Sequence, residues 1–402
     1  MVSSKMNPSF DQNSQSVNGR CCHICGHQAL EVFSLGSEYV RITSDCKPWP
    51  VRSELALCPK CQSVQSVVTS EWRRQISEIY RQYQVYHQGG GAEQVVFNST
   101  GDGHTRSSRI VARLEAHADL PARGHALDIG CGNGSFLAAF KNTFPEWLVS
   151  GAEFDDKHAD DLASLPDFQR LHTCGVDRIE GRFDFVSLIH TLEHIENPLP
   201  FLAAARSLLS PCGLIFIQVP HYRENPFELM TYDHATHFDV STLTSLLRLA
   251  ELQPISVSTD WVSKEISVIA SASVSSGIMP PSSGEEVHSC LEWLENLIKL
   301  ARKIQSNSES FGLFGSSIAA TWTAANLPHL PDFFVDEDVA RIGRKHLECV
   351  ILHPDQIPSD SVVFVALQPK IQRLIVDRYS QKKTANGLAA EQKNSCFFAF
   401  DN

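Results

Sequence analysis

Apolar positions in the middle of the chain change repeatedly between two spacings. Short continuous apolar runs predict strands at 126–129, 148–153, 183–189 and 214–219. Apolar residues three or four positions apart predict helices at 135–144, 199–209 and 240–250. Strands that alternate with helices in this way indicate a mainly parallel sheet with helices on both faces. We therefore expect an α/β domain with a Rossmann-like sheet over residues 125–270.

The pattern on either side of this domain predicts further units. A chain of 402 residues with 43% apolar content is long enough for more than one core, because single cores stop growing near about 250–300 residues. Helices are predicted over 72–86 and 285–305, glycines 89–91 predict a loop, and a Ser, Pro and Gly rich stretch predicts a linker at 271–284. The predicted units are a disordered tail (1–20), a small β module (21–70), a helical connector (71–124), the α/β domain (125–270), a long helix with a small C-terminal Rossmann-like α/β domain (285–380) and a polar tail (381–402).

The charge and hydropathy of the sequence limit the classes of binding partner and the cellular location that we expect. The formal net charge is -12, which disfavours nucleic acid and anionic membrane surfaces, because both attract clustered Lys and Arg. No run of about 18 apolar residues is present, and the polar N-terminus lacks an apolar signal core. We expect a cytoplasmic protein that is not anchored to a membrane and that acts on a small molecule.

The strongest chemical signal is a glycine-rich turn between a predicted strand and a predicted helix. The segment from Leu127 to Leu137 contains, in order, Asp128, Gly130, Cys131, Gly132 and Gly134. Glycines permit a turn with positive φ and let a ligand approach bare N–H groups at the start of a helix. The D-x-G-x-G-x-G spacing differs from the G-x-G-x-x-G of dinucleotide binders and suits the cationic methionyl part of S-adenosylmethionine (SAM).

A second acidic residue supports a nucleoside ligand at this turn. Glu153 ends the next predicted strand, where a carboxylate accepts hydrogen bonds from ribose hydroxyls. One alternative is a glycine turn that holds no ligand. Another is an NAD-dependent oxidoreductase, which the glycine spacing disfavours.

A third pattern follows the strand predicted over 183–189. Phe183-Asp-Phe-Val and the following His190-Thr-Leu-Glu193-His194 resemble two consecutive motifs of class I SAM-dependent methyltransferases. By the same resemblance, Val176 and Asp177 lie near the adenine and His190 joins the cofactor site. Capping and packing of the turn is the alternative role for His190 and Glu193.

Two C-x-x-C pairs predict a metal site in the N-terminal module. Cys22 with Cys25 and Cys58 with Cys61 offer four thiolates, the number that a closed, structural Zn²⁺ site requires. Cys21, His23 and Cys46 are near enough in sequence to substitute for one of them. Redox-active pairs are the alternative, but they need a thioredoxin-like βαβ context that is absent from this pattern.

A histidine-rich segment lies where parallel sheets hold their substrates. Residues 231–238, Thr-Tyr-Asp-His-Ala-Thr-His-Phe, follow a predicted strand that ends at 219 and precede a predicted helix. A histidine beside a carboxylate can remove a proton near neutral pH. His234 and His237 are therefore candidate bases, with packing or capping as the alternative for each.

The order of these parts resembles the bacterial nucleotide-sugar C-methyltransferase family over about residues 21–380. The resemblance implies a class I SAM methyltransferase fold in which the zinc module and the terminal domain help to enclose a nucleotide-linked keto sugar. It also implies that His234 is the base that forms an enolate, that Asp233 is its acidic neighbour, and that His194 contacts the substrate. The tyrosines at 80, 83 and 86 would close over that substrate, unless they only pack.

The chain departs from that family in the catalytic segment. Thr231 stands where the family has Tyr, Tyr232 where it has His, and Asp233 where it has Glu. Two alternatives therefore remain beside C-methylation of a sugar. One is an O-methyltransferase that acts on a polysaccharide precursor or another small molecule, and the other is a SAM-binding protein without catalysis.

Overall fold

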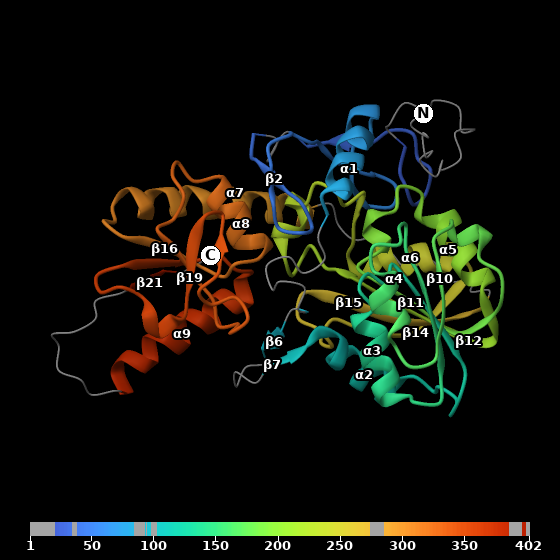
Figure 1. Cartoon of the computed structure of the whole chain (residues 1–402). Coiled ribbons are helices and arrows are strands. Elements are labelled where there is room, and N and C mark those ends of the chain that lie inside the picture. The colour runs from blue at the N-terminus through green and yellow to red at the C-terminus, as the bar shows by residue number, and fades with distance from the viewer. Residues whose placement is uncertain are drawn as a thin grey trace, which may run out of the picture.

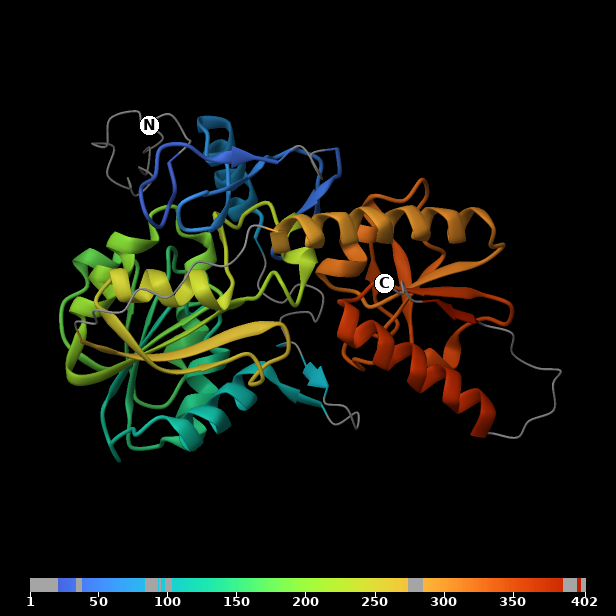
Figure 2. The ribbon, with the colours of Figure 1, turned by 180° about the vertical axis from the view of Figure 1, so that it is seen from behind.

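The structure, a computed structural model, describes residues 21–33, 38–83, 93, 95–97, 103–273, 285–385 and 396–398. Figures 1 and 2 show a central domain, a terminal domain beside it, and a smaller unit with helix α1 (Ser70–Arg81) across one end of the central domain. We call residues 21–69 the cysteine module. The predicted tail 1–20, Tyr86, the glycine loop 89–91 and residues 274–284 of the predicted linker lie outside the described residues.

The central domain is built on a seven-stranded sheet with the order β10-β9-β8-β11-β12-β15-β14. The strands are β8 (His125–Ile129), β9 (Leu148–Ala152), β10 (Phe168–His172), β11 (Phe183–Ile189), β12 (Leu209–Pro220), β14 (Leu252–Ser258) and β15 (Glu265–Ala272). The pairs from β10 to β12 are parallel, and only β15 runs antiparallel to its two neighbours. The predicted α/β class with a mainly parallel sheet is confirmed.

Helices cover both faces of this sheet because each buries one apolar side. α2 (Arg106–His117) and α3 (Ser135–Thr143) pack on the face that carries Phe185 and Phe216. α5 (Pro198–Ser207) and α6 (Val240–Leu249) pack on the face that carries Val186 and Ile217. A short helix, α4 (Ala159–Ala163), leads into β10. The three helices predicted within this domain are confirmed with bounds shifted by one or two residues, which is ordinary variation at helix ends.

The cysteine module contributes three strands to a four-stranded sheet. Strands β1 (Glu31–Val32), β4 (Leu55–Leu57) and β5 (Val64–Ser66) are joined by β13 (Thr236–His237), in the order β1-β4-β5-β13. A separate hairpin consists of β2 (Arg41–Ile42) and β3 (Pro48–Trp49). Because β13 belongs to the predicted histidine segment, the central domain completes the sheet of the module. The sequence pattern did not predict this pairing.

The connector between module and central domain is only partly helical. Helix α1 begins at Ser70, where the Thr69 side chain accepts a hydrogen bond from the N–H of Trp72, and it ends at Arg81 rather than at residue 86. A short hairpin, β6 (Val95–Phe97) with β7 (Gly103–Thr105), then leads into α2.

The terminal domain begins with a long helix, α7 (Glu285–Ser306). Its sheet has the order β18-β19-β17-β16-β20-β21. The elements are β16 (Phe311–Phe314), α8 (Ile318–Ala325), β17 (Phe333–Val335), β18 (Lys345–His346), β19 (Cys349–Leu352), β20 (Val362–Val365), α9 (Pro369–Ala385) and β21 (Cys396–Phe398). The predicted polar tail from residue 381 therefore needs correction, because α9 continues to Ala385 and β21 pairs with β20.

One apolar cluster joins the three units. The ring of Phe227, from the short 3₁₀ helix η4 (Pro226–Met230), lies edge-on to Trp293 of α7 at 5.6 Å and to Trp322 of α8 at 5.8 Å between centroids. Tyr39 of the cysteine module packs on Trp322 as well. The shared core fixes the module and the terminal domain against the central domain. Among the described helices, none combines the length and apolar character needed to cross a bilayer.

Candidate active site

The glycine turn after β8 has the conformation that its sequence predicts. Gly130 and Gly134 have φ of 80° and 81°, values that favour glycine. A Cβ on Gly130 would lie 2.2 Å from the Oγ1 of Thr191, so the turn also needs glycine for space. Asp128 at the strand end is buried and accepts a hydrogen bond from the Ser187 hydroxyl at 2.7 Å. Burial raises the pKa of Asp128 to about 7.

The second predicted acidic residue, Glu153, accepts a hydrogen bond from the same turn. The N–H of Gly132 donates to Glu153 Oε2 at 3.0 Å, and the N–H of Phe154 donates to Oε1 at 2.9 Å. The carboxylate is thereby aimed from the end of β9 at the turn after β8. The side chain of Cys131 is buried, and a Cβ on Gly151 would lie 2.6 Å from its sulfur, so a cofactor contact from this residue, which stays a prediction, would come from its backbone.

The other predicted cofactor residues lie at the same edge of the sheet. Val176 and Asp177 form the 3₁₀ turn η2 (Val176–Arg178) that follows β10, and His190 follows β11. The ends of β8, β9, β10 and β11 thus supply the whole predicted set, and carboxyl ends of parallel strands are where open α/β sheets bind ligands. The bare glycine backbone and the carboxylate of Glu153 fit an adenosyl ligand.

His190 lies between two buried carboxyl groups. Its Nδ1 is 3.1 Å from Glu193 Oε1, and its Nε2 is 3.5 Å from Glu265 Oε2. Its φ of 51° is unusual for a residue that is not glycine. Burial lowers the pKa of His190 well below its ordinary value and raises that of Glu193 well above it. Both ring nitrogens therefore face carboxyl groups. The predicted cofactor role of His190 did not include these contacts.

His194, at the end of η3 (Leu192–His194), contacts both the histidine segment and helix α1. Its Nδ1 is 3.0 Å from the carbonyl oxygen of Asp233 and 3.1 Å from the hydroxyl of Tyr80. A carbonyl oxygen can only accept, so Nδ1 carries the hydrogen. The rings of His194 and His234 meet edge to face at 4.7 Å. Burial lowers the pKa of His194 to about 4.

The hydrogen-bonded acid of His234 is Glu228, not Asp233. Glu228 Oε1 lies 2.7 Å from His234 Nδ1 and 3.0 Å from His237 Nδ1, and all three side chains are buried. Burial raises the pKa of Glu228 and lowers that of His234 to about 4. Asp233 is an acidic neighbour whose charge acts on His234, and its role beside the base stays a prediction. Glu228 was missed because it lies in η4, six residues before its partner.

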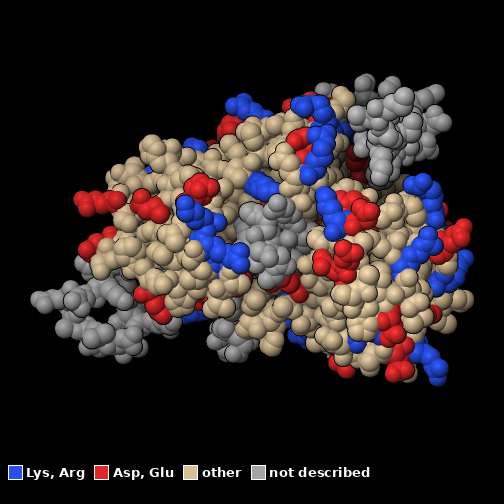
Figure 3. All heavy atoms as spheres, viewed as in Figure 1, with Lys and Arg blue, Asp and Glu red and all other residues tan. Residues whose placement is uncertain are grey.

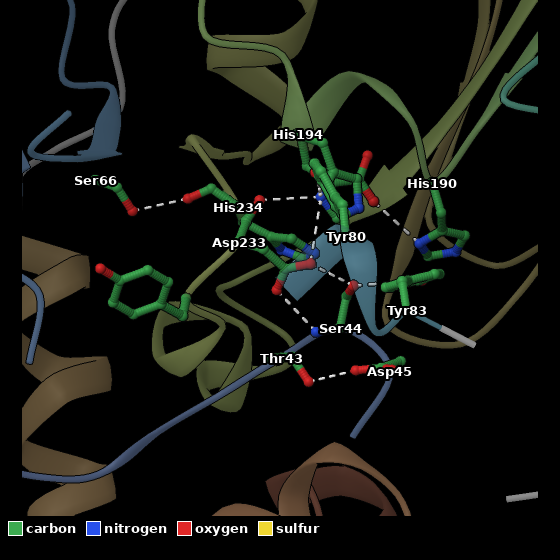
Figure 4. A network of polar contacts seen from close by, with 12 residues as sticks. Thr43, Ser44, Asp45, Ser66, Tyr80, Tyr83, His190, His194, Asp233 and His234 are labelled. Carbon is green, nitrogen blue, oxygen red and sulfur yellow. Dashed lines mark hydrogen bonds and ion pairs between the residues drawn. The ribbon is translucent and has the colours of Figure 1, made fainter. Parts of the chain in front are cut away.

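The carboxylate of Asp233 is held by the cysteine module (Figure 4). The N–H and Oγ of Ser44 donate to its two oxygens at 2.8 and 2.6 Å. The side chain of Asp233 is fully buried, and Oδ2 lies 3.7 Å from His194 Nδ1. Asp233 thus connects the Ser44 loop of the cysteine module to His194.

The backbone of the histidine segment is bonded to the same module. The N–H of Tyr232 donates to the Ile42 carbonyl at 2.7 Å, and the N–H of Ser66 donates to the Ala235 carbonyl at 3.0 Å. The Ser66 hydroxyl adds a bond of 2.7 Å to the carbonyl of His234. The segment that carries the candidate base is therefore bonded to the module, and its last part, β13, is the edge strand of the module's sheet.

Two of the three predicted tyrosines line this site. The ring of Tyr80 lies 5.9 Å from Phe154, which follows Glu153, and 6.2 Å from His194, measured between centroids. Tyr83 packs edge-on to Tyr80 at 6.1 Å and lies near the Ser44 hydroxyl. The tyrosines thus bridge the cofactor turn and the histidines.

The four predicted cysteines converge at one point. Their sulfurs all lie within 4.8 Å of one another, with Cys22 3.4 Å from Cys61 and Cys25 3.6 Å from Cys58. The N–H groups of Ile24 and Cys25 point at the sulfur of Cys22 at 3.4 Å, as expected around a thiolate ligand. Neither Cys21 nor Cys46 belongs to this cluster, and His23 Nδ1 instead contacts Thr236 Oγ1 at 3.2 Å. Four clustered thiols fit a tetrahedral zinc ion.

Comparison with known proteins relates the central part of the chain to methyltransferases. A family profile described as "Methyltransferase domain" matches residues 102–257. An enzyme named ubiquinone biosynthesis O-methyltransferase from Cereibacter sphaeroides is 27% identical over 160 residues, which cover 34% of this chain and 64% of that protein. The enzyme of the same name from Burkholderia thailandensis is 24% identical over 166 residues, 36% of this chain and 70% of its own.

One solved methyltransferase structure was matched at low similarity. The 1,6-didemethyltoxoflavin-N1-methyltransferase from Burkholderia thailandensis is 19% identical, covers 56% of this chain and 96% of its own, and has a TM-score of 0.39. The chain spans less than two thirds of the length of the Cereibacter relative, because the match covers 64% of it. Together with the profile match and the glycine turn, the sheet identifies the central domain as a class I SAM-dependent methyltransferase domain.

Proposed function

We propose that the protein transfers the methyl group of SAM to a small molecule and that His234 is the base that activates the acceptor. The observation that carries this proposal is the 2.7 Å contact between His234 Nδ1 and the buried Glu228 carboxyl group, at the sheet edge where the cofactor turn lies. Bound SAM would supply an electrophilic methyl group on a sulfonium, so the protein must position an acceptor and remove its proton.

The surroundings of His234 suit a base. Glu228 accepts the hydrogen of Nδ1, so Nε2 holds the lone pair, as in other histidines oriented by a carboxylate. Burial lowers the pKa of His234 to about 4, which keeps the imidazole neutral at neutral pH, so that its free nitrogen is available to accept a proton. His194 covers one side of the ring and restricts the direction from which an acceptor approaches.

For the acceptor we propose a nucleotide-linked keto sugar that is methylated on carbon. Three features support it: the order of module, methyltransferase domain and terminal domain, the packing of all three around η4, and the tyrosines beside His194. Deprotonation next to a ketone would give the carbon nucleophile that such a reaction needs. Acidic and basic side chains are interspersed on the face shown in Figure 3, which suits a small molecule better than a polyanion.

O-methylation is the second candidate. It is favoured by the relatives from Cereibacter sphaeroides and Burkholderia thailandensis, both named O-methyltransferases. In that reaction His234 would remove a hydroxyl proton. NMR of the methylated product separates the two, since a new C–CH₃ group contradicts O-methylation and a new O–CH₃ group contradicts C-methylation.

The departures at Thr231 and Tyr232 are compatible with catalysis, because the Thr231 side chain is buried and the Tyr232 side chain packs against the cysteine module. Tyr232 is buried beside Trp49, and its carbonyl accepts a hydrogen bond from Trp72 Nε1 at 3.2 Å. In a SAM-binding protein without catalysis, His234 and Glu228 would have no catalytic role. Turnover of any acceptor excludes that alternative.

We further propose that Cys22, Cys25, Cys58 and Cys61 hold a structural zinc ion. Four protein ligands leave no open position on a tetrahedral metal, so its role is to stabilise the module that carries β13. A cytoplasmic location is part of the same proposal.

The test combines calorimetric titration with S-adenosylhomocysteine and a methyl-transfer assay with thymidine diphosphate-4-keto-6-deoxyglucose. Binding of S-adenosylhomocysteine and a methylated product, which is lost in His234→Ala, support the proposal. A His234→Ala variant with wild-type turnover contradicts the role of the base.

A further inference from the structure

Among the described residues, several buried side-chain atoms near the carboxyl edge of the central sheet have no hydrogen-bond partner. Three of them belong to neighbouring residues: Nε2 of His190, Oε1 of Gln218 and Oε2 of Glu265. The first and the last face each other at 3.5 Å, the outer limit of a hydrogen bond. Because buried polar groups are almost always hydrogen-bonded, these atoms are suited to bind a polar group of a ligand.

The register of the sheet explains why the three residues meet. Gln218 of β12 pairs with Ser267 of β15, and Pro220 pairs with Glu265. Because side chains alternate along strands, Gln218 and Glu265 point to the same face. The Nε2 of Gln218 donates to the Ser267 hydroxyl at 2.9 Å, which fixes the amide and leaves Oε1 open.

His190 brings this group next to the cofactor turn. Its N–H donates to the carbonyl of Gln218 at 3.0 Å, and its Nε2 lies 3.5 Å from Glu265 Oε2. The following residue, Thr191, donates from its hydroxyl to the carbonyl of Ile129, directly before Gly130. The side chain of His190 is 24% exposed, whereas that of Glu265 is 2% exposed. A bound molecule can therefore contact the imidazole, with the carboxyl group behind it.

The left-handed backbone of His190, with φ of 51°, is consistent with a functional position. Such strain persists only where the surroundings hold it, and it concentrates at binding and catalytic sites. Here the ring is held by Glu193 at 3.1 Å. The contact with Glu193 fixes the orientation of the ring, so that Nε2 faces Glu265.

The charges around Glu265 allow its carboxyl group to carry a proton. Burial raises the pKa of Glu265 to about 7, although Arg106, at 3.9 Å, and Lys264 act in the opposite direction. The other ionisable groups that influence this pair are Glu193, His194, Glu228 and His234. Near neutral pH the carboxyl group of Glu265 can thus donate one hydrogen bond, and Oε1 of Gln218 can accept one, which is the pair that a hydroxyl group needs.

We propose that His190, Gln218 and Glu265 form a hydroxyl-binding subsite, which holds a hydroxyl of the acceptor beside the atom that receives the methyl group. This inference rests on the proposed function, because it assumes an acceptor above the cofactor turn. It goes further by assigning roles to Gln218 and Glu265 and by requiring an acceptor with a hydroxyl near the reacting atom. A sugar satisfies that requirement.

The test compares Glu265→Leu, which removes the proposed donor, with Glu265→Gln, whose amide N–H still donates a hydrogen bond. Calorimetry with thymidine diphosphate-4-keto-6-deoxyglucose, in the presence of saturating S-adenosylhomocysteine, measures acceptor affinity, and thermal unfolding without ligand measures stability. We expect acceptor affinity to fall by about tenfold or more in Glu265→Leu and to stay within about threefold in Glu265→Gln, with S-adenosylhomocysteine affinity within about twofold in both. Glu251→Leu, which alters an exposed carboxylate, is the matched control.

Each other outcome has one meaning. Loss of S-adenosylhomocysteine affinity in Glu265→Leu would place these residues in the cofactor site and overturn the inference. Unchanged acceptor affinity in Glu265→Leu, or an equal loss in Glu265→Leu and Glu265→Gln, would overturn it as well. If the wild type binds S-adenosylhomocysteine but not the keto sugar, the proposed acceptor is wrong and the inference that rests on it falls, while binding of the cofactor still supports the methyltransferase assignment.

Discussion

Ser44 of the cysteine module donates two hydrogen bonds, at 2.8 and 2.6 Å, to the carboxylate of Asp233, the residue directly before the proposed base. Asp233 is fully buried, so these bonds compensate its charge away from water. The module is therefore a structural part of the active site and not an appended domain.

Removal of the Ser44 hydroxyl tests this link. We expect Ser44→Ala to reduce methyl transfer by about tenfold, because a charge-assisted hydrogen bond contributes about 1.5–3 kcal/mol and its loss lets Asp233 and the histidine segment shift. Affinity for S-adenosylhomocysteine should stay unchanged. Ser77→Ala on α1, where the hydroxyl bonds only to the Arg73 carbonyl, is the control. Equal rates in both variants would show that Ser44 does not position the segment.

Loss of the proposed zinc ion should also destabilise the histidine segment. We expect Cys58→Ser to lack zinc by elemental analysis and to increase hydrogen exchange at residues 231–237, whose backbone bonds to Ile42 and Ser66 depend on a folded module. Cys212→Ser, at an exposed cysteine outside the cluster, should behave as the wild type. One zinc retained per chain in Cys58→Ser would mean that the ligand set is wrong.

The cofactor turn should tolerate no side chain at Gly130. We expect Gly130→Ala to weaken S-adenosylhomocysteine by about a hundredfold or more, because the new methyl group would meet Thr191 at 2.2 Å and distort the turn. Gly343→Ala isolates the backbone effect, since Gly343 has a similar φ of 78° but no atom within 4 Å of the added Cβ. Comparable loss of affinity in the two variants would contradict the proposed cofactor site.

Asp128 should make stability depend on pH in the absence of cofactor. Its pKa is raised from 3.8 to about 7 by burial, so between these values the unfolded chain ionises while the folded chain keeps the proton. Its stabilising contribution is complete below about pH 4 and is lost as pH rises towards 7. Between pH 4 and pH 8, the free energy of unfolding of Asp128→Asn in urea should rise relative to that of the wild type by roughly 2–4 kcal/mol.

An exposed aspartate provides the control for that series. Asp260→Asn should follow the wild type at every pH, because its side chain is solvated. A stability difference between Asp128→Asn and the wild type that does not change with pH would show that Asp128 titrates in the ordinary range.

The parts of the site that lie in one continuous segment could be predicted from the sequence. Strand, glycine turn and helix occupy Leu127 to Leu137, so Asp128, Gly130 and Gly134 are recognisable by spacing alone. The two C-x-x-C pairs are also local, and their convergence needs only that the module folds. Alternating apolar periods likewise predicted the parallel part of the sheet, because each strand and helix buries one side locally.

The partners of the histidines could not be predicted in this way. Asp233 is adjacent to His234 in sequence, but Asp233 bonds to Ser44 and the bond to His234 comes from Glu228. Glu265 meets His190 only because β15 runs antiparallel to β12. Ser44 reaches Asp233 through a tertiary contact. Such pairings depend on the packing of distant segments, which no local period records.

Substitution of His234 tests the central claim most directly, with cofactor binding and methyl transfer measured on the same samples. The account predicts that wild type and His234→Ala bind S-adenosylhomocysteine with affinities within a few fold, because the base lies outside the turn that holds the cofactor. It also predicts that methyl transfer to the acceptor falls by at least about a hundredfold in the variant. Transfer at the wild-type rate by His234→Ala, or a wild type that does not bind S-adenosylhomocysteine, would contradict it.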